Sequence, residues 1–274
     1  MDRFFLQDPP HHGTAVLTDE EAHHLLHVLR GKPGEQVVLF DGRGSEYTAE
    51  IVSTTRRDVQ LRILESRSVC RERKTPLTLA VTLPKGDRQK WLVEKLTELG
   101  VTRLISLATQ RSVATAERGT LVKLRRCVIE ASKQCRRNQL MEITEPMTWQ
   151  TFLSLCVSAR SAMDSSVDVS MEKNLPRRWW IAHPLETAAP LTELWMSGVN
   201  GMEPSFSMDS VSSTDRTSSE LAYGIVAVVG PEGGFTDEEV SAAIRVGFRP
   251  LSLGSRILRI ETAAIAIAAV EPPT

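Results

Sequence analysis

Apolar strands and amphipathic helices alternate from Leu77 onward, and this alternation restricts the fold more than any other feature. Strands are expected at 77–83, 103–109, 179–183, 224–230 and 250–254, with a weaker one near Glu142. Helices are expected at 87–99, 117–137, 237–246 and 262–270. Because strands separated by helices usually lie parallel, the pattern predicts an α/β domain with a mainly parallel sheet.

The preceding residues have a different pattern. A short helix is expected from Thr18 to Gly31, with Thr18 and Glu21 as a capping box, and the strand-like runs QVVLF, YTAEIV and VQLRIL follow it. These features predict a small barrel-like domain over residues 1–70, a charged linker over 71–76 and the α/β domain over 77–274. Within the last of these, nine Ser or Thr residues between 201 and 220 predict a disordered insertion.

Composition excludes several classes of protein. The apolar run Ala263–Val270 is too short to span a bilayer and MDRFFLQDPP has no apolar signal core, so a cytoplasmic protein without membrane contact is expected. The four cysteines form no CxxC pair, which argues against a disulfide framework or a thiolate zinc site. His23 and His27 have the i, i+4 spacing of a metal pair but no convincing third ligand, so no metal is expected.

The net charge of −1 conceals an uneven distribution. Residues 73–140 contain 15 Lys and Arg against 5 Asp and Glu, whereas 1–72 contain 9 against 12 and 141–274 contain 9 against 17. A basic block of this kind is typical of a protein that binds a polyanion, because each neutralised phosphate releases counterions. A solvated helix face rich in Lys and Arg is the alternative.

The stretch VVGPEGGFTDEEV, residues 228–240, places a glycine-rich loop between a strand and a helix. It matches neither GxxxxGK[ST] nor GxGxxG, and the charge of Glu232 would repel a phosphate. Thr236 and Glu239 form a second capping box. The glycines therefore indicate either a tight turn or close approach of the backbone to a neutral or cationic ligand.

A second glycine-containing loop lies in LSLGSRILRIETAAIAIA, residues 251–268. If both loops follow parallel strands, they meet over one pocket at the carboxyl edge of the sheet. In the alternative interpretation, Glu261 only offsets the helix dipole, and Arg256 and Arg259 are solvated.

Several segments together carry a family resemblance: MDRFF, HLLHVLRGKPG, LPKGDRQKWLVEKLTELGV, QRS, EASKQCRRN, GPEGGFTDEE and LGSRILRIETA. Over nearly the whole chain they resemble the RsmE-type 16S rRNA (uridine-N3) methyltransferases of the SPOUT superfamily. The resemblance implies a PUA-like RNA-binding domain followed by a SPOUT methyltransferase domain with a C-terminal trefoil knot. It also implies a homodimer that binds S-adenosylmethionine and methylates N3 of one uridine in the decoding region of 16S rRNA, on the assembled small ribosomal subunit.

Site residues follow from the resemblance and the residue chemistry. Arg259 is expected to stabilise charge on the uracil oxygens, and Glu261 to orient Arg259 or help remove the N3 proton. The expected cofactor-binding residues are Thr82, Leu83, Gly230, Glu232, Gly233, Leu253, Gly254, Ile257, Leu258 and Thr262. The expected RNA-binding residues are Arg3, His24, Arg30, Lys85, Arg88, Lys95, Arg111, Lys133, Arg136 and Arg137. Packing roles are expected for Trp91, Trp179 and Trp180.

Two alternatives stay open. One is a related SPOUT methyltransferase that acts on a ribose 2′-hydroxyl or a tRNA base, and the other is a ribosome-assembly factor without catalytic activity. Arg136 stands where a glycine or small residue is common in the family, and the insertion at 201–220 is unusual.

Overall fold

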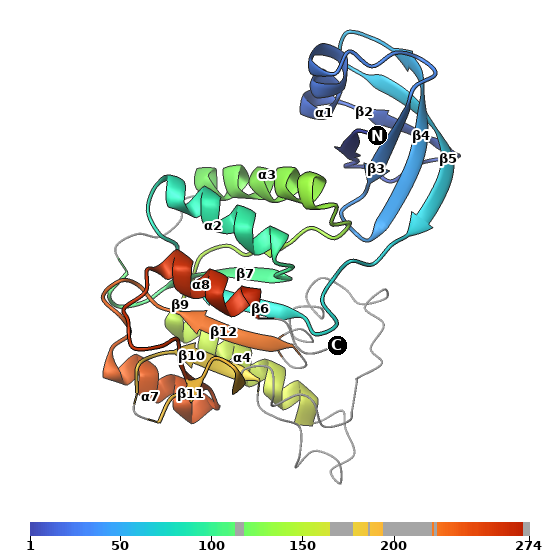
Figure 1. Cartoon of the computed structure of the whole chain (residues 1–274). Helices are drawn as coiled ribbons and strands as arrows, with labels where there is room; N and C mark the ends of the chain where they lie inside the picture. The colour runs from blue at the N-terminus through green and yellow to red at the C-terminus, as the bar shows by residue number, and fades with distance from the viewer. Residues whose placement is uncertain (113–117, 165–177, 186, 194–220, 222–223, 271–274) are drawn as a thin grey trace. The chain divides into compact units, whose positions relative to one another are not determined.

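The computed structural model describes residues 1–112, 118–164, 178–185, 187–193, 221 and 224–270 (Figure 1). Contacts divide the chain into two compact units. The first unit comprises Met1–Glu72 and Val128–Leu140, and the second comprises Arg73–Cys127 and Met141–Thr274. Residues 128–140, which the sequence-based limits include in the second domain, thus group with the first unit. The insertion expected at 201–220 lies outside the described residues.

The first unit contains a five-stranded sheet in the order β1-β3-β4-β5-β2. Its strands are β1 (Arg3–Phe5), β2 (Thr14–Leu17), β3 (Gln36–Phe40), β4 (Ser45–Thr54) and β5 (Val59–Ser68). The pair β1 and β3 is parallel, and the other pairs are antiparallel. Alternate side chains such as Val37 and Leu39 point into one core, which confirms the strands expected here.

The first helix differs from the sequence-based prediction. Helix α1 (Asp19–His23) continues into the π-helical turn η1 (His24–Val28), and Thr18 makes no side-chain capping bond. The Thr18 hydroxyl instead donates to Asp19. The Glu21 carboxylate accepts from Lys133 Nζ at 3.0 Å and from the Phe5 amide at 3.3 Å. The predicted capping box was wrong because Glu21 has a charged partner elsewhere in this unit.

The second unit contains a parallel sheet in the order β11-β13-β10-β12-β6-β7-β8, with β9 paired to β7. Its strands are β6 (Leu77–Val81), β7 (Arg103–Ala108), β8 (Glu142–Ile143), β9 (Met147–Thr148), β10 (Trp179–Ala182), β11 (Ala189–Pro190), β12 (Ile225–Val229) and β13 (Arg249–Ser252). Every residue of β6 and β12 is buried, as in a sheet covered on both faces. The expected parallel α/β sheet is confirmed.

Helices α2 (Asp87–Glu98) and α8 (Ile260–Ala269) lie on one face of this sheet, and α4 (Trp149–Asp164) and α7 (Asp237–Val246) lie on the other (Figure 1). Helix α3 (Arg118–Cys135) also matches an expected helix, whereas α4 was not predicted. Trp179 and Trp180 are buried as expected. Trp91 on α2 is 48% exposed, so its predicted packing role was wrong. Among the described helices, none is both long and apolar enough to cross a membrane.

Candidate active site

A cavity of about 390 Å³ opens at the carboxyl ends of three adjacent parallel strands. Its walls are His183 and Pro184 after β10, the loop 230–235 after β12, and the loop 253–258 after β13. Ile260 and Ala263 of α8 close one side. Because β13, β10 and β12 are neighbours in the sheet, these three loops meet where open α/β sheets bind ligands.

The loop 230–235 requires glycine at two positions. Gly234 has a φ of +68°, and its amide closes a tight turn by donating to the Pro231 carbonyl at 2.8 Å. A Cβ on Gly230 would lie 2.7 Å from the ring of Phe235. That ring is fixed in the core, 5.2 Å from the ring of Trp149. The glycines therefore let the backbone of the loop form part of the cavity wall.

The capping box predicted at the start of α7 is confirmed. The Glu239 amide donates to Thr236 Oγ1 at 3.3 Å, and the Thr236 amide donates to Glu239 Oε2 at 3.0 Å. The buried Glu239 carboxylate also accepts from the Gln110 amide at 2.8 Å through Oε1. One side chain thus connects the loop after β7 to the N-cap residue of α7, which directly follows the loop 230–235.

Arg111 is placed at the cavity rather than on a free surface. Its Nη1 donates to the carbonyls of Gly233 at 2.8 Å and Phe235 at 3.4 Å, and its side chain lines the cavity. The guanidinium that we expected to contact RNA is therefore engaged with the wall of the candidate site.

The loop 253–258 supplies most of the remaining wall. Gly254 has a φ of +102°, and Leu253, Ile257 and Leu258 line the cavity. Ile257 is 99% exposed. Arg259 follows as the N-cap residue of α8, with an exposed side chain and a carbonyl that accepts from the Ala263 amide.

Glu261, in the first turn of α8, is buried. Its Oε1 lies 3.4 Å from Arg88 Nη1, and Arg88 Nη2 lies 3.6 Å from Glu232 Oε1. Glu261 Oε2 is buried and has no hydrogen-bond partner among the described residues. The structure therefore pairs Glu261 with Arg88, and not with Arg259 as expected.

The expected cofactor-binding residues fall into two groups. Those that line the cavity are Gly230, Glu232, Gly233, Leu253, Gly254, Ile257 and Leu258. Thr82, Leu83 and Thr262 do not line it: Thr82 and Leu83 are buried after β6, and Thr262 is exposed on α8.

His183 lines the cavity but was absent from the sequence-based candidates. Its Nδ1 is buried and has no hydrogen-bond partner within the described residues. Burial lowers the pKa of this imidazole, and the nearby Asp237 charge opposes the shift only in part. The signal was available, since His183 directly follows the buried strand WWIA, at the edge where ligand-binding residues of parallel sheets gather.

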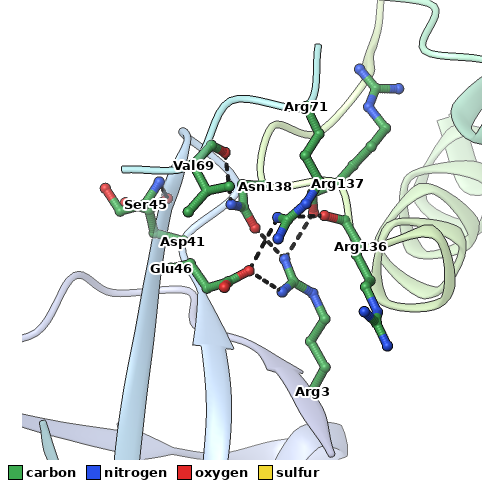
Figure 2. A network of polar contacts seen from close by, with 9 residues as sticks. All are labelled: Arg3, Asp41, Ser45, Glu46, Val69, Arg71, Arg136, Arg137 and Asn138. Atoms are coloured by element: carbon green, nitrogen blue, oxygen red, sulfur yellow. Dashed lines mark hydrogen bonds and ion pairs between the residues drawn. The ribbon is translucent and has the colours of Figure 1, made fainter. Parts of the chain in front are cut away.

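Three expected RNA-binding residues are instead paired within the first unit. Arg3 Nη1 lies 2.6 Å from Glu46 Oε2, Lys133 lies 3.0 Å from Glu21, and Arg137 lies 2.5 Å from Glu72. Their side chains are only 10%, 10% and 5% exposed. Figure 2 shows Arg3 also reaching the Arg137 carbonyl and Asn138. Little of their charge is open to solvent.

The other expected RNA-binding residues vary in exposure. Lys95 is held by Glu94 and Glu98 on α2, and His24 is half-buried with its ring edge-on to Phe4. Arg30, Lys85 and Arg136 are exposed and have no ion-pair partner within the part of the chain that the structure describes.

Comparisons with known proteins agree with this architecture. An RNA methyltransferase domain family matches residues 71–175 and 203–271, and an RNA methyltransferase PUA domain family matches 17–64. A ribosomal RNA small subunit methyltransferase E from Synechocystis is 32% identical over 250 residues, which cover 91% of this chain and 70% of the relative. This chain belongs to the ribosomal RNA small subunit methyltransferase E family. The Bacillus subtilis member is 29% identical, with coverage of 97% and 93%.

Solved structures of similar proteins have the same fold. The ribosomal RNA small subunit methyltransferase E of Neisseria gonorrhoeae, bound to S-adenosyl methionine, aligns with a TM-score of 0.73 and 27% identity, over 98% of this chain and 95% of that one. A Legionella pneumophila methyltransferase in complex with the same cofactor aligns with a TM-score of 0.72 and 28% identity, over 97% and 95%. The expected family, parallel α/β fold and N-terminal PUA domain are confirmed.

Proposed function

We propose that this chain uses S-adenosylmethionine to methylate N3 of a specific uridine in the decoding region of 16S rRNA, on the assembled small subunit. The cavity at the ends of β10, β12 and β13 is the observation that supports the proposal. Two solved structures with the same fold contain S-adenosylmethionine, and this cavity could hold it here. As part of the same proposal, the first unit is an RNA-binding domain, the second contains a trefoil knot, and the protein is a cytoplasmic homodimer.

The residues of the cavity fit this cofactor. S-adenosylmethionine has a cationic sulfonium and no phosphate, so the Glu232 carboxylate is compatible with it, and apolar side chains from 253–258 suit its adenosine. When bound, the cofactor supplies a methyl group for in-line transfer, which depends mainly on alignment with the acceptor. Backbone groups of the loops 230–235 and 253–258 would hold it in place. Thr82, Leu83 and Thr262 stay predicted contacts.

The acceptor must lose a proton, because uracil N3 is protonated at neutral pH. The exposed Arg259, at the start of α8, can reach a uracil oxygen and stabilise the charge that develops there. Glu261 keeps its predicted role of helping to remove the N3 proton: its Oε1 lies beside Arg88, and its Oε2 is buried without a hydrogen-bond partner among the described residues. The uridine itself must be unpaired or flipped out before its N3 can be reached.

Mass spectrometry of 16S rRNA and tRNA nucleosides from a deletion strain tests this function. Loss of 3-methyluridine, restored by the wild-type gene but not by Arg259→Ala, is the expected result. Loss of a 2′-O-methyl or tRNA modification would favour a different acceptor, and an unchanged nucleoside profile would favour an inactive assembly factor. Normal turnover by Arg259→Ala would contradict the role given to Arg259.

A further inference from the structure

Arg88 occupies a position that its predicted contact with RNA does not explain. It lies in the first turn of α2, and its guanidinium is between Glu232 of the loop 230–235 and Glu261 of α8. The two nitrogen–oxygen distances are 3.6 Å and 3.4 Å, so each Nη group faces a different carboxylate. One side chain thus joins three segments that are far apart in the sequence.

Burial makes the two contacts unequal. The Glu261 side chain is only 7% exposed, whereas Glu232 is 52% and Arg88 42% exposed. An exposed ion pair contributes little by itself, but a buried carboxylate without a cation is strongly unfavourable. Arg88 is therefore held mainly by Glu261. In turn, Arg88 can orient Glu232, the more exposed of its two partners, at the cavity wall.

The charges of this cluster also suit the proposed cofactor. Two carboxylates and one guanidinium leave a net negative charge beside the cavity, which complements a sulfonium. Without Arg88 the two carboxylates would repel each other and turn away from their present positions. A lysine could restore the charge but not the planar fork that faces two carboxylates at once.

We propose that Arg88 is a positioning residue of the cofactor cavity, whose guanidinium fixes Glu232 against the buried Glu261. This inference rests on the proposed binding of S-adenosylmethionine. It assigns Arg88 to the cofactor site in place of the RNA surface. Arg88 acts on the cofactor through Glu232, so its effect disappears when Glu232 is neutral.

Calorimetry of S-adenosylmethionine binding to the full-length protein tests the inference. For Arg88→Gln we expect the dissociation constant to rise about threefold to tenfold, and for Arg88→Lys a smaller rise. The matched control is Lys90→Gln, the same charge change at an exposed position of α2, which leaves the constant within about twofold. In a Glu232→Gln background, Arg88→Gln should add less than about a twofold effect. Equal weakening in both backgrounds, or intact cofactor binding with weakened RNA binding, would overturn the inference.

Hydrogen exchange separates this inference from the proposed function. Without any ligand, the amides of residues 230 and 232–235 should exchange faster in Arg88→Gln than in wild type or Lys90→Gln, because the loop loses its connection to α8. If wild type fails to bind S-adenosylmethionine while this difference is present, the proposed cofactor is wrong and the positioning role stands. Unchanged exchange in Arg88→Gln refutes the role, whatever the cofactor.

Discussion

Burial acts on Glu46 and His183 in different ways because their neighbours differ. At Glu46 burial raises the pKa, but hydrogen bonds and charges from Arg3 and Arg71 outweigh it, so the carboxyl has a lowered pKa. At His183 burial lowers the pKa, and Asp237 offsets only part of the shift. Glu46 is therefore held in its charged form and His183 in its neutral form.

Loss of the Glu46 charge should destabilise the first unit. Because its folded pKa lies below the unfolded value of 4.5, its contribution is present above that pH and is lost as the pH falls through the folded pKa. Glu46→Gln should lower the free energy of unfolding by about 1–3 kcal/mol at neutral pH and flatten its decline between about pH 5 and pH 3. Denaturant titrations across this range check both effects.

The control is Glu65→Gln, which breaks the exposed pair with Arg67 and should leave the pH dependence of the free energy of unfolding nearly unchanged. An equal loss of stability in Glu65→Gln would contradict the role of burial.

Protonation of His183 should oppose the binding of a cationic cofactor. Since its pKa is lowered, the imidazole is neutral at pH 7 and gains its charge only below the ordinary value of 6.5. The dissociation constant of S-adenosylmethionine should then rise in wild type as the pH falls below 6.5, but stay level in His183→Asn. Calorimetry at several pH values measures this. The same pH dependence in both proteins would show that another group is responsible.

The parts of the candidate site that depend on backbone conformation could be predicted from the sequence. The contacts between side chains that are far apart in the sequence could not. Glycines at 230 and 254 mark the two loops because turns and close approach restrict the residue type. In contrast, Arg88, Arg111 and Arg137 look like surface charges in the sequence. Their partners, Glu261, Gly233 and Glu72, lie on other elements, and local patterns carry no information about such contacts.

Among the structural elements, the loop 230–235 depends on α7 for its shape. Glu239 accepts hydrogen bonds from the Thr236 and Gln110 amides, one with each carboxylate oxygen. The loop after β7 is therefore fixed to the start of α7, and Arg111, which follows Gln110, is brought to the Gly233 carbonyl. A change at Glu239 acts on the cavity wall without touching a ligand.

Replacing this carboxylate should cost stability and loosen the wall. In Glu239→Gln one of the two backbone amides faces an NH₂ group instead of an oxygen, so the free energy of unfolding should fall by about 1.5–3 kcal/mol. Denaturant titration measures the loss, and hydrogen exchange should show faster exchange at Gln110 and Thr236. Glu238→Gln makes the same charge change in the same turn at an exposed position. If it destabilises the protein equally, the helix dipole rather than the two hydrogen bonds is responsible.

Elements with strong local patterns could be predicted, and those defined by tertiary contacts could not. Helix α7 matches its predicted limits because a capping box begins it and Gly247, in the left-handed region, ends it. Helix α4 was missed although Phe152 and Cys156 share one buried face and the Thr148 hydroxyl, directly before the helix, accepts from the Thr151 amide at 3.2 Å. The two-residue strands β9 and β11 exist only by pairing with β7 and β13.

Across the full chain, the structure reduces the predicted RNA-binding residues to a smaller set of available charges. Arg3, Lys133 and Arg137 are paired with carboxylates inside the first unit, Arg111 lines the cavity, and Arg88 is paired with Glu232 and Glu261. Arg30, Lys85 and Arg136 stay exposed without ion-pair partners among the described residues. Binding of RNA phosphates should therefore depend on Arg30, Lys85 and Arg136 and not on the total charge.

The salt dependence of RNA binding distinguishes the exposed arginines and lysine from those that are paired inside the first unit. Each phosphate contact releases counterions, so removing one contact should reduce the slope of log affinity against log salt by about 1. We expect this for Lys85→Gln and for Arg136→Gln, measured by fluorescence anisotropy with a decoding-region RNA fragment. Arg57→Gln, an exposed arginine outside the predicted set, is the control and should leave the slope unchanged.

Arg137→Gln should instead lower the free energy of unfolding, because Glu72 is left as a buried carboxylate without its partner. If Arg137→Gln keeps wild-type stability but reduces the slope as much as Lys85→Gln does, the buried arginine contacts RNA after all and the ion pair with Glu72 must open on binding.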